Sequence, residues 1–147
     1  MNDLWTYKYK PKKLDQIIGH RVQKKKIIDW LKNKESNKIN SLIVSGNHGI
    51  GKTTTVKLIL EKYGYDYRII YPNDIKEHRS ADNFSDLYNH ENSIYNKLST
   101  NVKGNRKLAL IINKTESITL TSEKKYILDI YKENNKNKSF PIIFISN

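Results

Sequence analysis

The sequence has no cysteine, few glycines and prolines, and only four arginines. The missing cysteine excludes disulfide bonds, thiolate metal sites and thiol catalysis, and fits a reducing compartment. No apolar run approaches the ~18 residues that cross a bilayer, and the N-terminal stretch MNDLWTYKYKPKK lacks the apolar segment of a signal peptide. We therefore expect a soluble intracellular protein without a membrane partner.

Acidic residues are also scarce. The chain of 147 residues has 27 lysines and arginines against 15 aspartates and glutamates, a formal net charge of +12. Such an excess favours a polyanionic partner, usually nucleic acid, because bound phosphates release counterions. An AT-rich genome, which raises lysine, asparagine and isoleucine together, is the alternative explanation. The length suits one domain with a real hydrophobic core.

Short apolar runs alternate with helical patterns along the chain. We expect parallel strands covered on both faces at 41–45, 67–71, 108–112 and 142–145. Helical stripes are expected in four places: Ile27, Trp30 and Leu31 in 21–32; Val56, Ile59, Leu60 and Tyr63, ending at Gly64; Phe84, Leu87, Tyr88, Tyr95 and Leu98; and Tyr126, Ile127, Ile130 and Tyr131, with Ser122 as N-cap. This alternation predicts an α/β fold. Residues 33–40 form a polar linker, and Lys24, Lys25 and Lys26 are interpreted as a solvated face.

The stretch LIVSGNHGIGKTTT, residues 42–55, has the pattern of a phosphate-binding loop between a strand and a helix. Glycines let the backbone curl around phosphates, while the helix N-terminus favours an anion. The pattern predicts that Lys52 reaches the β- and γ-phosphates of ATP and that Thr53 ligates Mg²⁺. The predicted nucleotide-binding residues of the loop are Gly46, Asn47, His48, Gly49, Ile50, Gly51, Lys52, Thr53 and Thr54.

The acids expected of a hydrolysing site are missing. An enzyme of this type ends a neighbouring strand with an aspartate that holds the Mg²⁺ water shell, often followed by a glutamate that activates the attacking water. Here the strand LALII runs into Asn113 and Lys114. Glu116 is a weak candidate substitute, because its reach to the γ-phosphate requires a rearranged turn. We expect nucleotide binding with little or no hydrolysis.

These residues resemble the large subunit of replication factor C, the AAA+ clamp loader. LWTYKYKPKKLDQIIGH followed by GNHGIGKTT carries the resemblance most specifically, and similarity continues in order along the chain. It implies that residues 1–40 contribute to an adenine pocket and 41–147 form an incomplete AAA+ nucleotide-binding domain. The residues placed near the base are Tyr9, Pro11, Ile17 and Ile18, with ordinary core packing as the alternative.

The resemblance also assigns later segments. DYRIIYPNDIK keeps Asp74 of a family motif, and Lys76 takes an arginine position, although Tyr71 and Pro72 depart from the pattern. Asn113 and Lys114 stand where the family has its two acids. Asn147 corresponds to the sensor-1 residue that touches the γ-phosphate.

The sequence stops at Asn147, where the family continues to an arginine finger, a fifth strand, a helical lid and a collar. In the family strand order 5-1-4-3-2, this predicts that the strand carrying the phosphate loop forms an exposed edge. A partner, a second polypeptide carrying the remainder, or poor stability are the alternatives that follow.

The implied partners are clamp-loader small subunits, a sliding clamp and primer-template DNA, in a hetero-oligomer of the nucleus or a cytoplasmic replication site. Candidate contacts to the DNA backbone are Lys76, Arg79, Lys103, Arg106 and Lys107, each of which is also plausible as a solvated surface charge.

Two other function classes remain. One is a non-catalytic module in which the basic surface or the aromatic N-terminus binds nucleic acid or protein on a remnant phosphate-loop scaffold. The other is a small kinase, disfavoured because no arginines group as a lid. The histidines are too scattered to predict a metal site.

Overall fold

The computed structural model describes residues 4–33, 40–73, 75, 107–137 and 140–147. The helices are α1 (Trp5–Lys8), α2 (Arg21–Lys32), α3 (Lys52–Lys62) and α7 (Thr121–Asn137), with short 3₁₀ turns at Leu14–Gln16 and Thr115–Ser117. The strands are β1 (Ser41–Ser45), β2 (Tyr65–Ile70), β3 (Lys107–Ile112) and β4 (Ile142–Ser146). The expected helical stripe at 84–98 lies outside the described residues.

The four strands form one parallel sheet in the order β1-β4-β3-β2. This confirms the expected α/β fold and the 1-4-3-2 part of the predicted strand order. Strand bounds agree with expectation to within two residues. β2 begins earlier than predicted because its ladder with β3 already starts at Tyr65 opposite Lys107, directly after Gly64.

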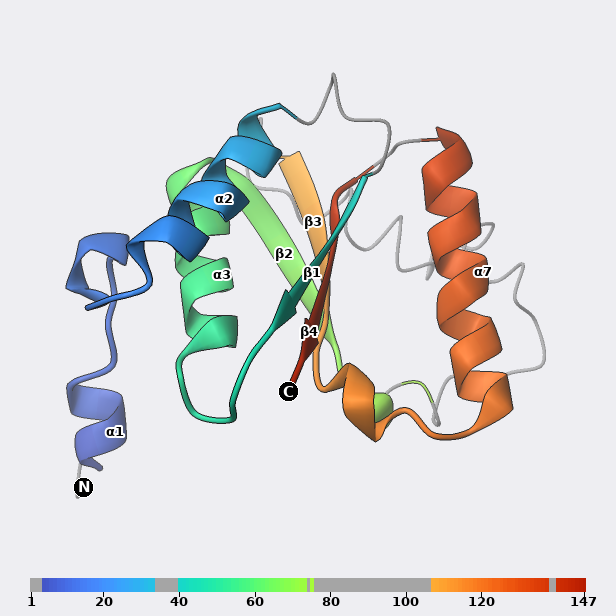
Figure 1. The fold of residues 1–147 in the computed structure, drawn as a ribbon, viewed down its shortest axis with the longest axis horizontal. Coiled ribbons are helices and arrows are strands. Elements are labelled where there is room, and N and C mark those ends of the chain that lie inside the picture. The colour runs from blue at the N-terminus through green and yellow to red at the C-terminus, as the bar shows by residue number, and fades with distance from the viewer. Residues whose placement is uncertain (1–3, 34–39, 74, 76–106, 138–139) are drawn as a thin grey trace.

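The sheet separates two hydrophobic cores. Figure 1 shows α2 and α3 on one face of the sheet and α7 on the other. Alternate residues of a strand point to opposite faces, so β3 contributes to both cores. Ala109 and Ile111 pack in the core with α2 and α3, whereas Leu110 and Ile112 pack in the core with α7. The nearly continuous apolar runs of the sequence therefore reflect burial on both faces.

Two local predictions about helices were wrong, one about the N-cap of α7 and one about the exposure of Lys24. Ser122 is not the N-cap of α7, because Leu120 already accepts the first helical hydrogen bond, from Lys124 N, at 3.1 Å. The Glu123 carboxylate accepts from Leu120 N at 3.4 Å, which is the acidic half of a capping box. Lys24 is half-buried and does not belong to the solvated face of Lys25 and Lys26.

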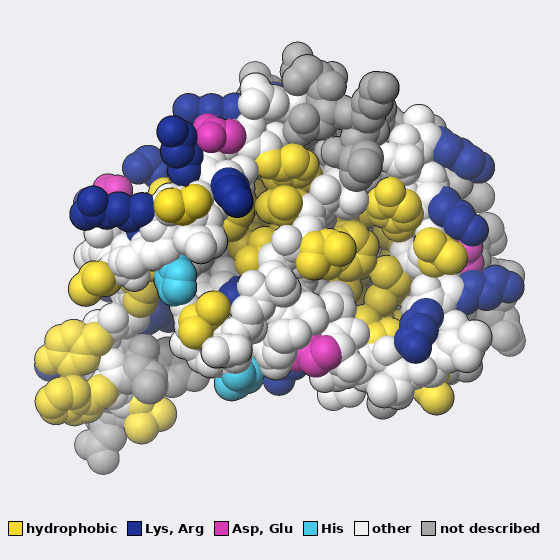
Figure 2. Space-filling model, viewed as in Figure 1, with side chains coloured by type: hydrophobic (Ala, Val, Ile, Leu, Met, Phe, Trp, Pro, Cys, Tyr) yellow, Lys and Arg dark blue, Asp and Glu magenta, His cyan; other side chains and the backbone are white. Residues whose placement is uncertain are grey.

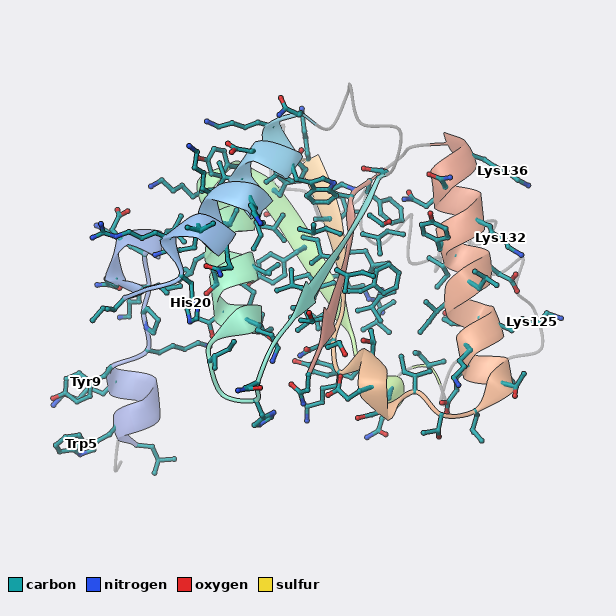
Figure 3. All side chains as sticks on the ribbon, viewed as in Figure 1. Trp5, Tyr9, His20, Lys125, Lys132 and Lys136 are labelled. Atoms are coloured by element: carbon teal, nitrogen blue, oxygen red, sulfur yellow. The ribbon has the colours of Figure 1, made fainter. Side chains whose placement is uncertain are left out.

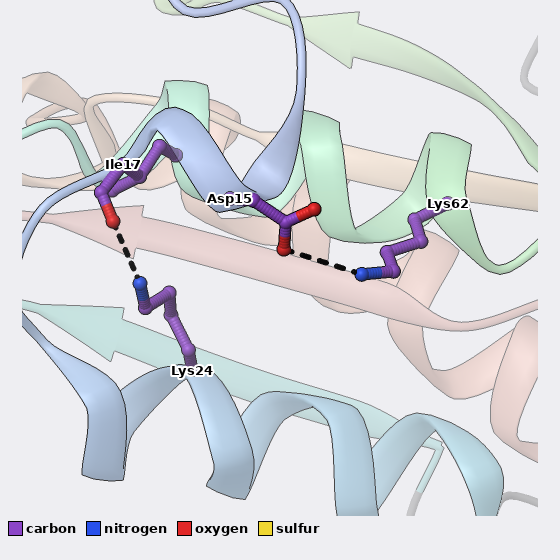
Figure 4. A network of polar contacts seen from close by, with 4 residues as sticks. All are labelled: Asp15, Ile17, Lys24 and Lys62. Atoms are coloured by element: carbon purple, nitrogen blue, oxygen red, sulfur yellow. Dashed lines mark hydrogen bonds and ion pairs between the residues drawn. The ribbon is translucent and has the colours of Figure 1, made fainter.

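The chain before α2 is tied to the domain by polar contacts (Figure 4). Lys24 Nζ donates to the carbonyl of Ile17 at 2.9 Å, and Lys62 of α3 pairs with Asp15 at 3.5 Å. The Asp15–Lys62 pair is exposed, so its contribution to stability is small. Together with the burial of Leu14, these contacts place residues 14–18 beside α2 and α3.

β1 forms an edge of the sheet beside an apolar groove. Ile43 is 73% exposed, and the groove, of about 450 Å³, runs between β1, β4 and α7. Apolar side chains that line it include Ile43, Ile127, Leu128, Tyr131 and Phe144. Figure 2 shows hydrophobic surface between the sheet edge and α7. The exposed edge predicted from the strand order is thus present among the described strands.

An exposed apolar edge strand promotes edge-to-edge association. We expect Ile43→Lys to weaken self-association of the purified protein by about tenfold, equivalent to ~1.4 kcal/mol, because a lysine on the edge opposes strand pairing. Sedimentation velocity over a range of concentrations measures this. Ile18→Lys, at another exposed isoleucine, is the control. Equal self-association of wild type and both variants would show that the β1 edge is not the surface through which the protein associates.

Candidate phosphate-binding site

The loop between β1 and α3 has the backbone conformation that its glycines predict. Gly46, Gly49 and Gly51 have φ values of +154°, +81° and +87°, in a region that other residues adopt only with strain. A Cβ on Gly46 would also lie 2.9 Å from the Ile50 side chain. The side chains of Asn47, His48 and Ile50 are exposed. These exposed side chains lie on the loop that leads directly into the N-terminus of α3, where an anion is favoured.

The Lys52 side chain folds back over this loop. Its ammonium donates to the carbonyls of Gly46 at 2.5 Å and Asn47 at 2.8 Å, and to Oδ1 of Asn147 at 2.9 Å. All three acceptors are uncharged, and no ion pair of Lys52 occurs among the described residues. A half-buried cation with only neutral partners is a favourable position for a phosphate group.

Thr53 and Asn113 come together although 60 positions separate them. The Thr53 hydroxyl donates to Oδ1 of Asn113 at 3.3 Å. Asn113 is buried at the end of β3, where its N–H donates to the carbonyl of Ile70 at 2.9 Å. The loop threonine and the residue at the expected acid position are therefore neighbours, but the oxygen facing Thr53 belongs to a neutral amide.

The turn after Asn113 brings Glu116 back to the site. Lys114 is exposed and has a left-handed conformation, with φ 55° and ψ 48°. The 3₁₀ turn Thr115–Ser117 follows, and the Thr115 hydroxyl donates to the carbonyl of Ile145 at 3.3 Å. Through this turn Glu116 contacts Asn147, while its reach to the γ-phosphate stays a prediction.

Glu116 binds Asn147 through both carboxylate oxygens. Oε1 accepts from Nδ2 of Asn147 at 2.8 Å, and Oε2 accepts from the Asn147 backbone N–H at 3.2 Å. Nδ2 also lies 3.5 Å from Nδ1 of His48. A backbone N–H in its own turn, the N–H of Asn147 and the charge of Lys52 hold the pKa of Glu116 below its usual value. The carboxylate is therefore ionised at neutral pH.

Sequence reasoning named each of these residues but missed how they connect. Glu116 and Asn147 lie 31 positions apart, and no local pattern pairs them. The available signal was that Glu116 follows β3 by a few residues and Asn147 follows β4. Neighbouring parallel strands end at the same edge of a sheet, so residues just beyond both ends can meet.

The N-terminal residues assigned to an adenine pocket differ in their surroundings. Ile17 packs against the core shared by α2 and α3, so ordinary packing describes it. Tyr9 is 65% exposed and Ile18 94% exposed, so core packing does not. Pro11 is half-buried. In Figure 3, Tyr9, which directly follows α1, lies near Trp5 of α1 in the part of the chain that projects from the rest of the molecule. Their role at a base stays a prediction.

Of the proposed DNA contacts, the structure describes only Lys107. It is exposed at the first residue of β3, opposite the strand end that carries Asn113. The other four, Lys76, Arg79, Lys103 and Arg106, lie outside the described residues, as do Asp74, His78 and His90. Within the described ranges no three His, Asp or Glu side chains gather in a way that could hold a metal ion.

Comparison with known proteins decides the family. The family model described as the Rad17 P-loop domain matches residues 1–128. The chain belongs to the Rad17/replication factor C P-loop family. The resemblance inferred from the motifs is thereby confirmed.

Curated relatives of the family agree. The chain is 31% identical, over 97% of its length, to a putative replication factor C large subunit of Acanthamoeba polyphaga mimivirus, of which it covers 30%. It is 32% identical, over 83% of its length, to a replication factor C small subunit of Methanocella arvoryzae, of which it covers 35%. The chain thus spans about a third of the length of these relatives.

A solved structure supports the fold. The AMPPCP-bound DnaA of Aquifex aeolicus matches 95% of this chain and 42% of its own, with a TM-score of 0.60 and 15% sequence identity. At that identity the likeness concerns the α/β fold alone, which is similar to that of this AAA+ ATPase. No helix in the part of the chain that the structure describes combines the length and apolarity needed to span a membrane.

Proposed function

We propose that this Rad17/replication factor C family protein binds ATP with Mg²⁺ as a clamp-loader-type subunit and hydrolyses it slowly or not at all. The observation that carries the proposal is the loop ammonium of Lys52, whose hydrogen-bond acceptors among the described residues are all neutral. It lies beside a site where Asn113 and Lys114 stand in the expected acid positions. The DnaA neighbour was solved with the ATP analogue AMPPCP, which supports nucleotide binding by analogy.

The residues of the loop suit a nucleoside triphosphate. Backbone N–H groups of the glycine-rich turn would surround the phosphates, and Lys52 would turn from the loop carbonyls to the β- and γ-phosphates. The Thr53 hydroxyl is the candidate ligand for Mg²⁺, whose role would be to neutralise phosphate charge. Asn113, 3.3 Å from Thr53, could accept or donate a hydrogen bond in the water shell of the ion.

Slow hydrolysis follows from charge. Asn113 brings no negative charge to the side of the metal, and Lys114 is a cation where a base would be needed. A general base typically contributes a factor of about 10² to 10⁴ to the rate. Bound ATP would therefore stay intact at the site, and ATP binding rather than ATP hydrolysis would control what the protein does.

Restoring the acids tests this explanation. We expect the double substitution Asn113→Asp and Lys114→Glu to raise phosphate release from ATP by about a hundredfold, the lower end of the contribution of a general base. Lys114→Ala, which removes the cation without supplying a base, is the matched control and should gain little. Wild-type release near an ordinary enzymatic rate of ~10 s⁻¹ would instead show that another group activates water.

Assembly is the second part of the proposal. Relatives named as replication factor C large and small subunits support small subunits as partners. The sliding clamp and primer-template DNA come from the resemblance of the sequence motifs to the clamp-loader family. Among the described strands β1 has an unpaired edge, and this edge and its apolar groove are compatible with a further polypeptide. Size-exclusion chromatography with small subunits from the same source, with and without ATP, tests this. Separate elution under both conditions would remove the clamp-loader role and leave nucleotide binding.

A second candidate function rests on a different surface. Residues 4–33 contain nine lysines and arginines against two aspartates. Figure 2 shows blue side chains gathered over α2, and Trp5 and Tyr9 are exposed with ring centroids 5.5 Å apart. Exposed aromatic rings among cations suit single-stranded nucleic acid, whose bases stack while its phosphates pair with lysines. The protein would then be a non-catalytic binding module.

A further inference from the structure

The side chains of Glu116, Asn147 and Lys52 form a polar chain across the candidate site. Lysine can only donate hydrogen bonds and an ionised carboxylate can only accept them. Asn147 therefore has to present Oδ1 to Lys52, at 2.9 Å, and Nδ2 to Glu116, at 2.8 Å. The second carboxylate oxygen holds the Asn147 backbone at 3.2 Å. Chemistry thus fixes the orientation of this amide.

A terminal phosphate needs the same donors that this chain already uses. Phosphate oxygens accept hydrogen bonds, so a γ-phosphate next to Lys52 would recruit the ammonium and, from Asn147, Nδ2. Both donors are engaged here, one with Oδ1 of Asn147 and the other with Glu116. A triphosphate would have to take Nδ2 from the carboxylate and would add negative charge beside Glu116.

A diphosphate makes a smaller demand. The backbone of a phosphate loop holds the α- and β-phosphates, and the lysine reaches the β- and γ-phosphates. Without a γ-phosphate, Lys52 has to leave its loop carbonyls, but the two hydrogen bonds between Glu116 and Asn147 can persist. Glu116 therefore lowers the affinity for a triphosphate more than the affinity for a diphosphate.

Resting on the proposed nucleotide binding, we propose that Glu116 sets the nucleotide preference of the site by competing with the γ-phosphate for Asn147. Glu116 is not assigned the role of a catalytic base. It is a specificity residue that lowers the affinity for nucleoside triphosphate relative to diphosphate, so that triphosphate binding requires release of Asn147 from its carboxylate.

The test compares two nucleotides in Glu116→Gln. Glutamine keeps an oxygen that can accept from Asn147 Nδ2 but removes the charge. We expect the affinity for Mg²⁺–AMPPCP to rise about fivefold while the affinity for Mg²⁺–ADP stays within about twofold, because the group is exposed and screened. Isothermal titration calorimetry of the purified protein measures both constants. The difference should shrink as salt is raised.

The control is Asp129→Asn, which removes one half-buried negative charge from α7. An increased triphosphate-to-diphosphate ratio in Glu116→Gln alone supports the proposal. An unchanged ratio, equal gains for both nucleotides, or weaker AMPPCP binding overturns it. Loss of phosphate release from ATP with an unchanged ratio also overturns it and assigns Glu116 to catalysis.

Folding and function remain distinguishable. Glu116→Ala is a second variant, and a melting temperature equal to wild type for either variant shows that the site change is local. If folded wild-type protein binds neither nucleotide, the proposed function fails, and the inference fails with it. If both nucleotides bind and only the ratio is insensitive to Glu116, the inference alone fails.

Discussion

Lys52→Ala is expected to weaken ATP binding by about a hundredfold. The ammonium lies over the phosphate loop on the carbonyls of Gly46 and Asn47, and within the described residues it forms no ion pair with a carboxylate. When a phosphate arrives, two charge-assisted hydrogen bonds replace these neutral contacts. A net gain of about 1.4 kcal/mol for each of the two bonds, near the lower end of the range for hydrogen bonds to charged groups, totals ~2.8 kcal/mol, which equals two decades in Kd. Fluorescence titration with a labelled ATP analogue and Mg²⁺ measures the change.

Lys57→Ala is the matched control. Lys57 lies on the same helix, but its ammonium is placed over the Tyr67 ring, 5.8 Å from the centroid, rather than over the loop. This variant removes the same charge and should bind ATP like wild type. Equal weakening of ATP binding in both variants would show that the effect comes from the net charge of the protein. Unchanged ATP binding in Lys52→Ala would show that the loop does not bind phosphate.

The same Lys52→Ala protein separates the two candidate functions. Fluorescence anisotropy with a labelled single-stranded oligonucleotide measures the basic surface independently of the loop. If the protein is a non-catalytic module, oligonucleotide binding persists in Lys52→Ala and falls in Trp5→Ala. If wild type and Lys52→Ala both fail to bind the oligonucleotide, the aromatic and basic N-terminal surface is not a nucleic-acid-binding site.

Ile111→Ala is expected to lower the free energy of unfolding by about 3 to 4 kcal/mol. Ile111 is fully buried in β3, between Ile69 of β2 and Ile143 of β4, and packs in the core with α2 and α3. Truncating a buried isoleucine removes transfer free energy and leaves a cavity, which together cost about 2 to 5 kcal/mol. A central strand relaxes little, which places the cost in the upper part of that range. Urea unfolding followed by circular dichroism measures it.

The control for stability is Ile18→Ala, where 94% of the residue is exposed and the expected change is below ~0.5 kcal/mol. If Ile111→Ala does not fold, Ile111→Val offers a milder step with an expected loss of about 0.5 to 1.5 kcal/mol. Equal losses at positions 111 and 18 would contradict the placement of the core.

Local patterns were enough to predict the elements of this fold. The apolar run at 108–112 indicated a buried strand, since a strand covered on both faces has no polar alternation, and the structure buries Ala109 to Ile112. The spacing of Gly46, Gly51 and Lys52 indicated a phosphate loop, because positive φ and the following helix are requirements within a few residues. The errors concerned the N-cap of α7, which is Leu120 rather than Ser122, and the exposure of Lys24, which bonds to Ile17.

Local sequence patterns were thus sufficient for the strands and for the helix after the loop, and they predict that Asn113 and Lys114 stand where two acids are expected. Only the tertiary structure decided that Glu116, Asn147 and Lys52 meet, because their approach depends on the left-handed turn at Lys114 and on the pairing of β4 beside β1. The tertiary structure also shows that the side chains of Tyr9 and Ile43 are exposed. Side-chain periodicity is set by neighbours along the chain, whereas contacts across 31 or 95 positions depend on how the strands assemble.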